Sequence, residues 1–372
     1  MNSSEIYLRY PPERDIVFVM GAGTSHPDGV PLQEDILPAI LSKGFNEIEE
    51  SPIGRTVIEF IKDNFYINHE KNLYPQLESV FAFMDHFLFE RESLSSKYSN
   101  SFIYYTKENL IKLIHYIIEL QADKKSFYYH KFWEAVVNNN KNISIITLNY
   151  DTLLEQAFDF LFPEKGLIDY CFHLMNYNTD QALKPFRFWI NAREPVNIIN
   201  NAHPVPYKIL KVHGSLNWKY CNCCNQTLLT PWDRKIDLFH GKFLGYTPDK
   251  KEYSFSCPLD GTDFQTLIIP PSYHKFIKSS VISQLLNESA REIHCAKKIV
   301  FIGYSLSGTD AHIKALFKKN LKNDTKVFVI NNENSDNLKA KYLSLTSNIE
   351  FIDSSFENLL SDDNLLARIF NL

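Results

Sequence analysis

The chain has 372 residues, of which 44% are hydrophobic and 14% aromatic, so it can bury a large core. No apolar run reaches the roughly 18 residues that a membrane span needs, and no basic segment followed by an apolar one opens the chain, so we expect a cytoplasmic protein. The net charge of -5 argues against a dedicated nucleic-acid binder, and no sequence-specific contact with nucleic acid is expected.

Short apolar runs alternate with longer amphipathic segments along the chain. The first run, residues 15–20, has the near-continuous apolar character of a parallel strand buried on both faces, and it leads directly into Gly21. Further strands are predicted at residues 143–147, 208–212, 267–269, 298–302, 326–330 and 349–352. Helical periodicity follows most of them. This alternation predicts an α/β fold with a Rossmann-like, doubly wound parallel sheet.

Two stretches are expected to depart from this sheet. Residues 32–138 carry almost no strand pattern but repeat apolar residues at helical spacing, which predicts a helical insertion. Residues 220–264 hold four of the six cysteines together with Gly and Pro, which predicts a small excursion resembling a zinc ribbon. We therefore expect a single domain over residues 1–372 that contains both excursions.

Glycine and polar residues follow four of the predicted strands. In α/β folds, ligand sites form at the carboxyl ends of parallel strands. The four motifs, in chain order, are Gly21-Ala22-Gly23-Thr24-Ser25, Asn149-Tyr150-Asp151, His213-Gly214 and Gly303-Tyr304-Ser305-Leu306. Their shared position predicts that they form one functional site.

The glycines of the first motif have a steric explanation. Gly21 and Gly23 would let backbone amides approach a diphosphate, and Thr24 and Ser25 would add hydroxyl donors. The third glycine of the dinucleotide fingerprint is absent, so on its own the motif fits a plain strand-to-helix turn as well as a phosphate site.

Asn149 and Asp151 lie two residues apart, a spacing that lets both face the crevice if the backbone is extended. The alternative for Asp151 is to cap a helix over residues 152–160, with Glu155 close to a capping-box position. His213 stands beside Gly214 at a strand end, where packing requires neither residue. Because imidazole titrates near neutral pH, we favour a functional histidine there.

A further helix is predicted near the end of the chain. Thr309 or Asp310 is expected to cap it, which places His312 in its first turn.

The cysteines suggest half of a zinc site. Cys221 and Cys224 form a C-x-x-C pair, but the second half offers only Cys257, with Asp260 three residues later. A structural zinc held by the three cysteines is one interpretation, with the remaining ligand open, and reduced thiols in a loop are the other. Two further residues could supply that ligand: Cys223 and His240.

Together these motifs resemble those of sirtuins, over most of the chain. In sirtuins, the corresponding elements bind NAD and cleave its nicotinamide glycosidic bond. The resemblance implies the glycine loop at the diphosphate, Asn149 and Asp151 at the nicotinamide ribose, and His213 as general base. The adenosine side would be held by Gly303, Ser305 and Asn331.

The departures from the sirtuin pattern concern the segments that bind the acylated peptide in sirtuin deacylases. Sirtuin deacylases carry Phe-Arg shortly after the glycine loop, where this chain reads Pro31-Leu32-Gln33-Glu34. They also place Phe-Gly-Glu after the zinc module, where this chain reads Ile268-Ile269-Pro270-Pro271-Ser272-Tyr273. The chain therefore resembles the divergent bacterial sirtuin-like domains that hydrolyse NAD in antiphage defence.

This resemblance implies an NAD hydrolase that takes NAD as its substrate and releases nicotinamide and ADP-ribose. Because a standing NAD hydrolase would be toxic, we expect its activity to be held back by self-assembly as a homo-oligomer or by a separate partner. The resemblance suggests an associated ATPase of the HerA helicase type as one candidate partner. Two alternatives stay open: an NAD-dependent protein deacylase, and a catalytically silent scaffold subunit that binds NAD or ADP-ribose.

Overall fold

The computed structural model describes residues 3–42, 44–122, 124–161, 166–174, 189–190, 196–199, 205–229, 236–246, 252–254, 256–257, 259–273 and 279–371. The chain divides into two compact units. Unit 1 comprises Met1–Gly29, Lys124–Gly214 and Ile277–Leu372, and unit 2 comprises Val30–Asp123 and Ser215–Phe276. Within the described residues, no helix has the length and apolar character to cross a membrane.

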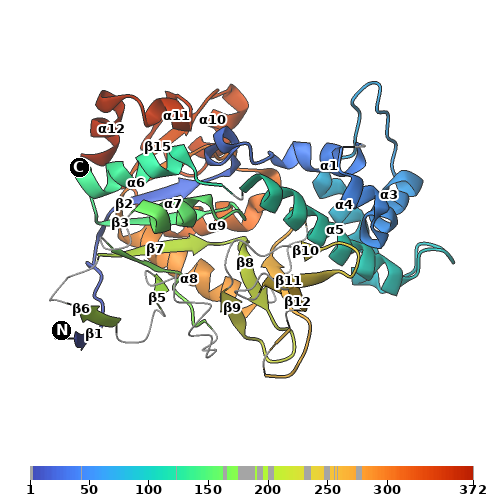
Figure 1. The fold of residues 1–372 in the computed structure, drawn as a ribbon. Helices are drawn as coiled ribbons and strands as arrows, with labels where there is room; N and C mark the ends of the chain where they lie inside the picture. The colour runs from blue at the N-terminus through green and yellow to red at the C-terminus, as the bar shows by residue number, and fades with distance from the viewer. Residues whose placement is uncertain are drawn as a thin grey trace. The chain divides into compact units, whose positions relative to one another are not determined.

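Unit 1 is built on an eight-stranded sheet in which every neighbouring pair is parallel (Figure 1). Its strands, in spatial order, are β16 (Ile349–Asp353), β15 (Lys326–Asn331), β14 (Ala296–Ile302), β2 (Arg14–Met20), β3 (Ile143–Thr147), β7 (Val205–Lys211), β4 (Gly166–Asp169) and β5 (Trp189–Ile190). The chain continues from β2 to β3 on one side and returns to β14 on the other. This reversal is the switch point of a doubly wound sheet, so the predicted fold class is confirmed.

Six of the seven predicted strands lie in this sheet, with bounds shifted by at most a few residues. The seventh predicted strand, residues 267–269, does not belong to the parallel sheet. β13 (Gln265–Ile268) belongs to a separate three-stranded sheet, in which it lies beside β8 (Gly214–Tyr220), and β9 (Thr227–Leu229) follows on the other side of β8. A short apolar run indicates a strand but carries no information about its pairing partner.

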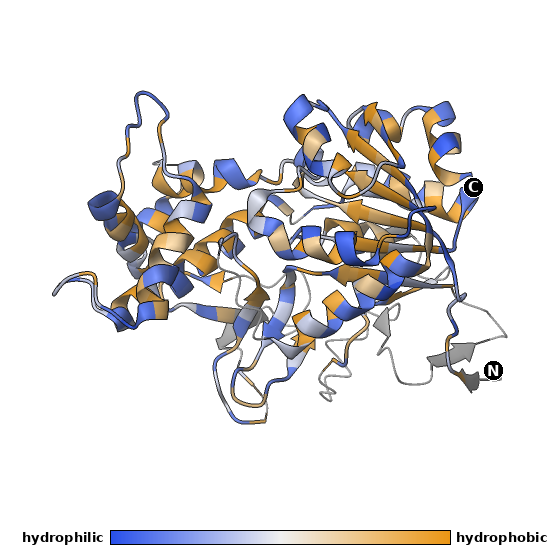
Figure 2. Cartoon of the chain, turned by 180° about the vertical axis from the view of Figure 1, so that it is seen from behind, coloured by the Kyte–Doolittle hydropathy of each residue, from blue (hydrophilic) through white to orange (hydrophobic). Residues whose placement is uncertain are grey.

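Helices cover both faces of the parallel sheet (Figure 1). One face carries α6 (Phe127–Asn139), α7 (Leu153–Leu161) and α12 (Asp363–Phe370), and the other carries α8 (Ser280–Cys295), α9 (Ala311–Asn320) and α10 (Asp336–Leu343). Alternate residues of a strand point to opposite faces. Accordingly, the ring of Phe18 contacts Phe132 of α6, whereas the ring of Phe301 contacts Phe317 of α9. Figure 2 shows hydrophobic residues concentrated along the strands between these layers.

The remaining described elements of unit 1 are short. They are the 3-10 helices η1 (Ala22–Thr24), η2 (His26–Asp28) and η3 (Gly308–Asp310), α11 (Phe356–Leu359), and an antiparallel pair formed by β1 (Ser3–Ile6) and β6 (Val196–Ile199).

Unit 2 combines a helical cluster with short antiparallel strands. Its helices are α1 (Gln33–Leu41), α2 (Asn46–Glu50), α3 (Pro52–Asn64), α4 (Leu77–Glu90) and α5 (Asn100–Ala122), and α3 and α4 both pack on α5. Its second three-stranded sheet contains β10 (Ile236–Asp237), β11 (Lys242–Tyr246) and β12 (Glu252–Ser254). The last helix of residues 32–138, α6, belongs to unit 1. The predicted boundaries of the two excursions stay predictions.

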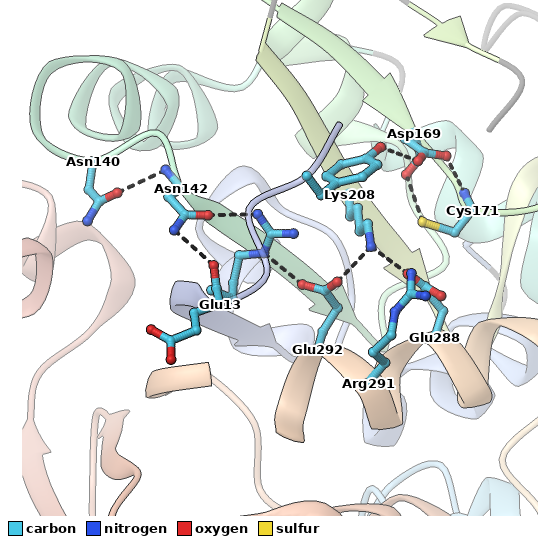
Figure 3. A network of polar contacts seen from close by, with 11 residues as sticks. Glu13, Asn140, Asn142, Asp169, Cys171, Lys208, Glu288, Arg291 and Glu292 are labelled. Carbon is cyan, nitrogen blue, oxygen red and sulfur yellow. Dashed lines mark hydrogen bonds and ion pairs between the residues drawn. The ribbon is translucent and has the colours of Figure 1, made fainter. Parts of the chain in front are cut away.

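A buried ion network ties two strands of the sheet to α8 (Figure 3). Arg14 Nε lies 2.8 Å from Glu292 Oε2, and Lys208 Nζ lies 2.7 Å from Glu292 Oε1. All three side chains are at most 4% exposed. Burial alone would raise the pKa of Glu292, but the hydrogen bond from Arg14 and the charge of Lys208 hold it below its ordinary value. The carboxylate is therefore ionised and joins β2 and β7 to α8.

Glu292→Gln is expected to lower the free energy of unfolding at neutral pH by about 3–5 kcal/mol, because buried Arg14 loses its counter-charge and Lys208 keeps only Glu288 as an ion-pair partner. A carboxyl group whose pKa is depressed by folding stabilises above its unfolded pKa of about 4.3, and that stabilisation is lost as the pH falls through the folded pKa. Urea unfolding of wild type and variant should therefore differ less at about pH 3 than at about pH 7.

Arg291→Ala on the same helix is the matched control. The Arg291 side chain is 64% exposed, and its ion-pair partner in the described part of the chain is Glu288, so its removal should cost less than about 1 kcal/mol. An equal effect of the two substitutions would contradict the assigned role of Glu292.

Candidate functional site

The two glycine motifs meet where β2 and β14 end. Gly23 N donates to Gly303 O over 3.0 Å. A Cβ on Gly21 would lie 2.5 Å from Gly303 O, and a Cβ on Gly23 would lie 2.7 Å from Gly303 Cα. Gly303 itself has a φ of +59°, which favours glycine. The two loops therefore pack backbone against backbone at the switch point of the sheet.

Asn149 links the end of β3 to the first of these loops. Its Nδ2 lies 3.0 Å from Gly21 O, 3.1 Å from Thr24 Oγ1 and 3.0 Å from Ser25 Oγ. A carbonyl oxygen can only accept, so the contact with Gly21 fixes which end of the amide faces the loop. The carbonyl oxygen Oδ1 takes part in none of these three contacts. The predicted neighbourhood of Asn149 and the glycine motif is thus present in the structure.

Thr24 and Ser25 are fully buried, and their hydroxyls have partners inside the protein. Thr24 Oγ1 donates to Gly21 O over 2.8 Å. The hydroxyl of Tyr129 lies 2.8 Å from Thr24 Oγ1 and 2.9 Å from Ser25 Oγ. Ala22 is exposed and Gly23 partly so. The surface that this loop offers to a ligand is therefore mainly backbone.

Tyr129 is a site residue that sequence reasoning missed. It lies in α6, within the stretch predicted as a helical insertion, and its side chain is 1% exposed. In the sequence it shares helical spacing with Phe132, Trp133 and Val136, a pattern typical of a core helix face. Nothing in that pattern separates a tyrosine that braces a loop from one that fills the core.

Asp151 sits at the start of α7. Its Oδ1 accepts a hydrogen bond from Leu153 N over 3.1 Å. Burial raises the pKa of this carboxyl group, against the charge of Lys211 and a hydrogen bond from Ser25, which lower it. Glu155 is fully buried, and its Oε1 lies 3.0 Å from Lys211 Nζ and accepts a hydrogen bond from the Tyr170 hydroxyl over 2.9 Å. Asp151 thus both contacts the helix start and joins the network around Ser25.

His213 lies between β7 and β8, and its side chain is 6% exposed. Its Nε2 is 3.3 Å from His312 Nε2 and 3.5 Å from Asp310 Oδ1. The other oxygen of Asp310 accepts a hydrogen bond from the hydroxyl of Tyr304 over 2.9 Å. The ring of Tyr150 lies 6.4 Å from the His213 ring, centroid to centroid. The predicted histidine is thus buried beside a second histidine and a carboxylate.

Asp310 and His312 were expected only as parts of a helix start. His312 does lie in the first turn of α9, and Asp310 occupies the N-cap position. Of the two predicted candidates, Thr309 and Asp310, it is thus Asp310 that holds the N-cap position, but its side chain accepts no capping hydrogen bond from the helix. The carboxylate instead accepts a hydrogen bond from Tyr304 and lies beside His213. The contact with His213 joins distant parts of the chain, so helix signals cannot reveal it.

The late motifs lie along the ends of β14 and β15. Asn331 Nδ2 donates to Tyr304 O over 3.1 Å, and Gly303 N donates to Ile330 O over 3.0 Å. Ser305 is exposed. Because Tyr304 contacts both Asn331 and Asp310, it connects the late motifs to the histidine pair.

A cysteine cluster forms in unit 2. Cys221, Cys224, Cys257 and Asp260 bring one possible ligand atom each to within 4.8 Å of the others. The Sγ atoms of Cys224 and Cys257 are 3.8 Å apart, close to the edge of about 3.8 Å expected for a tetrahedron with Zn–S bonds of about 2.3 Å. These donors fit zinc. Among the open choices for the fourth ligand, the group contains Asp260 and neither Cys223 nor His240.

Gly21→Ala is expected to lower the free energy of unfolding by about 1–3 kcal/mol, because its methyl group would overlap the backbone of Gly303. Gly308→Ala is the matched control, since a Cβ there meets nothing within 4 Å. It should change stability by less than about 0.5 kcal/mol. Thermal and urea unfolding measure both, and equal effects would argue against the loop packing described here.

Comparison with known proteins gives a family and a set of similar structures. A family model described as the SIR2-like domain matches residues 143–352, more than half of the chain. A structure of a Sir2 homologue in complex with NAD is similar, with 12% identity, a TM-score of 0.46, and coverage of 96% of this chain and 90% of that chain. A mutant Sir2 homologue in complex with 2′-O-acetyl ADP-ribose has 13% identity and a TM-score of 0.46, and 97% and 94% of the two chains are covered.

A structure of Sir2 with a p53 peptide and NAD+ has 12% identity and a TM-score of 0.42, over 94% of this chain and 91% of that chain. No protein of curated function matches the sequence. The family match begins at the first residue of β3 and runs into β16, so it takes in the Asn149, His213 and Gly303 motifs. The chain therefore belongs to the SIR2-like domain family.

Proposed function

We propose that unit 1 binds NAD and hydrolyses its nicotinamide glycosidic bond, releasing nicotinamide and ADP-ribose. The observation that carries this proposal is the arrangement at the carboxyl ends of the parallel strands. There, a side-chain-free glycine loop, an asparagine braced against it and a buried histidine come from three neighbouring strands. Membership of the SIR2-like family supports NAD as the substrate.

The glycine loop, exposed at Ala22 and partly exposed at Gly23, is the proposed seat of the diphosphate. The amide contact is assigned to Ala22, because Gly23 N already donates to Gly303 O. Small residues let amide groups approach the phosphate oxygens closely. The adenosine side is assigned to Gly303, Ser305 and Asn331, which follow the next two strands of the sheet. Thr24 and Ser25 act in this proposal by holding the loop, because both hydroxyls are bonded internally.

The reaction breaks the bond between C1′ of the ribose and the nicotinamide nitrogen. The bonding electron pair moves to the pyridinium nitrogen and neutralises it, and the oxygen of a water molecule bonds to C1′. His213 takes the proton of that water as general base. The carbonyl oxygen of Asn149 orients the ribose or the water, and Asp151 stabilises positive charge as it develops on the ribose.

Hydrolysis is favoured over deacylation because the chain lacks both peptide-binding segments of sirtuin deacylases. Pro31-Leu32-Gln33-Glu34 stands where those enzymes have Phe-Arg, and Ile268-Ile269-Pro270-Pro271-Ser272-Tyr273 stands where they have Phe-Gly-Glu. A silent scaffold is disfavoured because Asn149 and His213 are both present.

His213→Ala should reduce NAD cleavage by about 10²–10⁴-fold, the usual contribution of a general base. Asn149→Ala should be at least as harmful, because it removes both the oriented carbonyl and the brace of the glycine loop. Purified protein is incubated with NAD, with and without an acetylated peptide, and the products are separated by chromatography.

His294→Ala is the matched control, since His294 is an exposed histidine of α8 outside the site. Nicotinamide and ADP-ribose formed without peptide, and lost in the two site variants, are the expected result. Turnover that requires the peptide and yields an acetylated ribose would restore the deacylase alternative. Unchanged cleavage by His213→Ala would remove His213 from the mechanism.

A structural zinc in unit 2 is the second part of the proposal, with Cys221, Cys224, Cys257 and Asp260 as ligands. A bound zinc would hold the strands of this region together, since structural zinc sites contribute folding energy directly. Cys257→Ser should lower the zinc content by about one ion per chain and lower the melting temperature.

Cys295→Ser in α8 is the control for this substitution, because Cys295 lies outside the cluster. Zinc is counted by mass spectrometry after dialysis. The same zinc content in both variants would refute the site.

An unrestrained NAD hydrolase would deplete the NAD of its own cell, so we propose that its activity is restrained. The resemblance to bacterial defence proteins supports restraint by homo-oligomerisation or by an associated ATPase of the HerA type, in a cytoplasmic antiphage system. A purified monomer with full activity would contradict this part of the proposal.

A further inference from the structure

Three possible metal ligands converge beside the proposed general base. His213, Asp310 and His312 bring one nitrogen or oxygen atom each to within 4.8 Å of the others. His213 comes from the connection between β7 and β8, and the other two come from the start of α9. The group is separate from the cysteine cluster, which lies in unit 2.

The distances within this group match those of a metal site. A tetrahedral ion with bonds of about 2.0–2.1 Å to nitrogen and oxygen places its ligand atoms about 3.3–3.4 Å apart. His213 Nε2 and His312 Nε2 are 3.3 Å apart, and His213 Nε2 lies 3.5 Å from Asp310 Oδ1. Both of these distances agree with the three side chains binding one shared ion.

Asp310 is also held as a metal-binding carboxylate would be. Its side chain stands at a helix start and yet accepts no capping bond. Its Oδ2 accepts a hydrogen bond from the hydroxyl of Tyr304 over 2.9 Å, which fixes the direction of the other oxygen, Oδ1. Ligands of metal ions are usually oriented by hydrogen bonds of this kind.

We propose that His213, Asp310 and His312 bind a first-row divalent cation, and that zinc is the best match. Two imidazoles and one carboxylate are the ligand set of several zinc enzymes, which leave the fourth position to water or substrate. Chemically this set differs from the thiolates of the cysteine cluster, so the two sites can be distinguished by substitution.

Binding of the cation has a consequence that rests on the proposed function. A metal ion bound to His213 Nε2 occupies the lone pair that a general base needs to take a proton. The cation therefore inhibits NAD hydrolysis reversibly, and a chelator restores it. Control of the proposed activity would then lie within the site itself, at the histidine that the reaction uses.

The test of binding does not involve activity. Full-length protein loaded with zinc during expression, and dialysed free of loosely held metal, is titrated with zinc chloride in a calorimeter. Wild type should bind about one further zinc per chain. His312→Ala and Asp310→Asn should weaken this binding at least about ten-fold, while His294→Ala should leave it unchanged.

His312 is partly exposed, so His312→Ala is expected to fold, and circular dichroism checks each variant. Equal zinc binding by wild type and His312→Ala would overturn the proposal. So would a wild type that binds no zinc beyond the amount it retains on dialysis.

The test of inhibition compares the rate of NAD cleavage of each variant with its own rate in the absence of added zinc. Zinc should inhibit wild type, and EDTA should reverse the effect. His312→Ala should need at least about ten-fold more zinc for the same fractional inhibition. If the variants lose zinc binding but the wild type never cleaves NAD, the zinc site is upheld and the proposed function is rejected. Cleavage that zinc binding leaves unchanged or accelerates would overturn the inhibitory role.

Discussion

The contact between two glycine loops is the constraint on which the rest of the site depends. Gly21 and Gly23 touch Gly303 so closely that no side chain fits between them. This contact brings the ends of β2 and β14 together at the point where the sheet reverses its order. With the two loops fixed, Asn149 can reach Gly21 from one side and Tyr304 can reach Asn331 from the other.

Around this contact, the polar side chains form hydrogen bonds mainly with one another. Asn149, Thr24, Ser25 and Tyr129 form hydrogen bonds among themselves, away from water. A buried polar network of this kind rigidifies a site when its members have partners. A ligand would thus meet a preformed backbone surface, which reduces the ordering cost of binding.

Much of the fold follows from local patterns, and much of the site does not. Apolar runs that end in glycine located β2 and β14, because buried parallel strands have a recognisable composition. β4 and β5 were missed, since they have only four and two residues, too few to show a periodicity. The positions of Asn149 and His213 at strand ends also came from the sequence. Asp310 and Tyr129 did not, because their partners lie about 100 residues away in the chain.

The spread of the site along the chain affects how the protein is made. Asn149 and Gly21 are 128 residues apart, with all the described helices of unit 2, α1 to α5, encoded between them, and Gly303 follows much later. Chains emerge from the ribosome from the N-terminus, and contacts between distant residues form late. A nascent chain therefore carries its glycine loop long before the partner loop exists. Throughout most of its own synthesis, the polypeptide has therefore not formed the contact between its two glycine loops, and a prematurely terminated product that ends before Gly303 cannot form it.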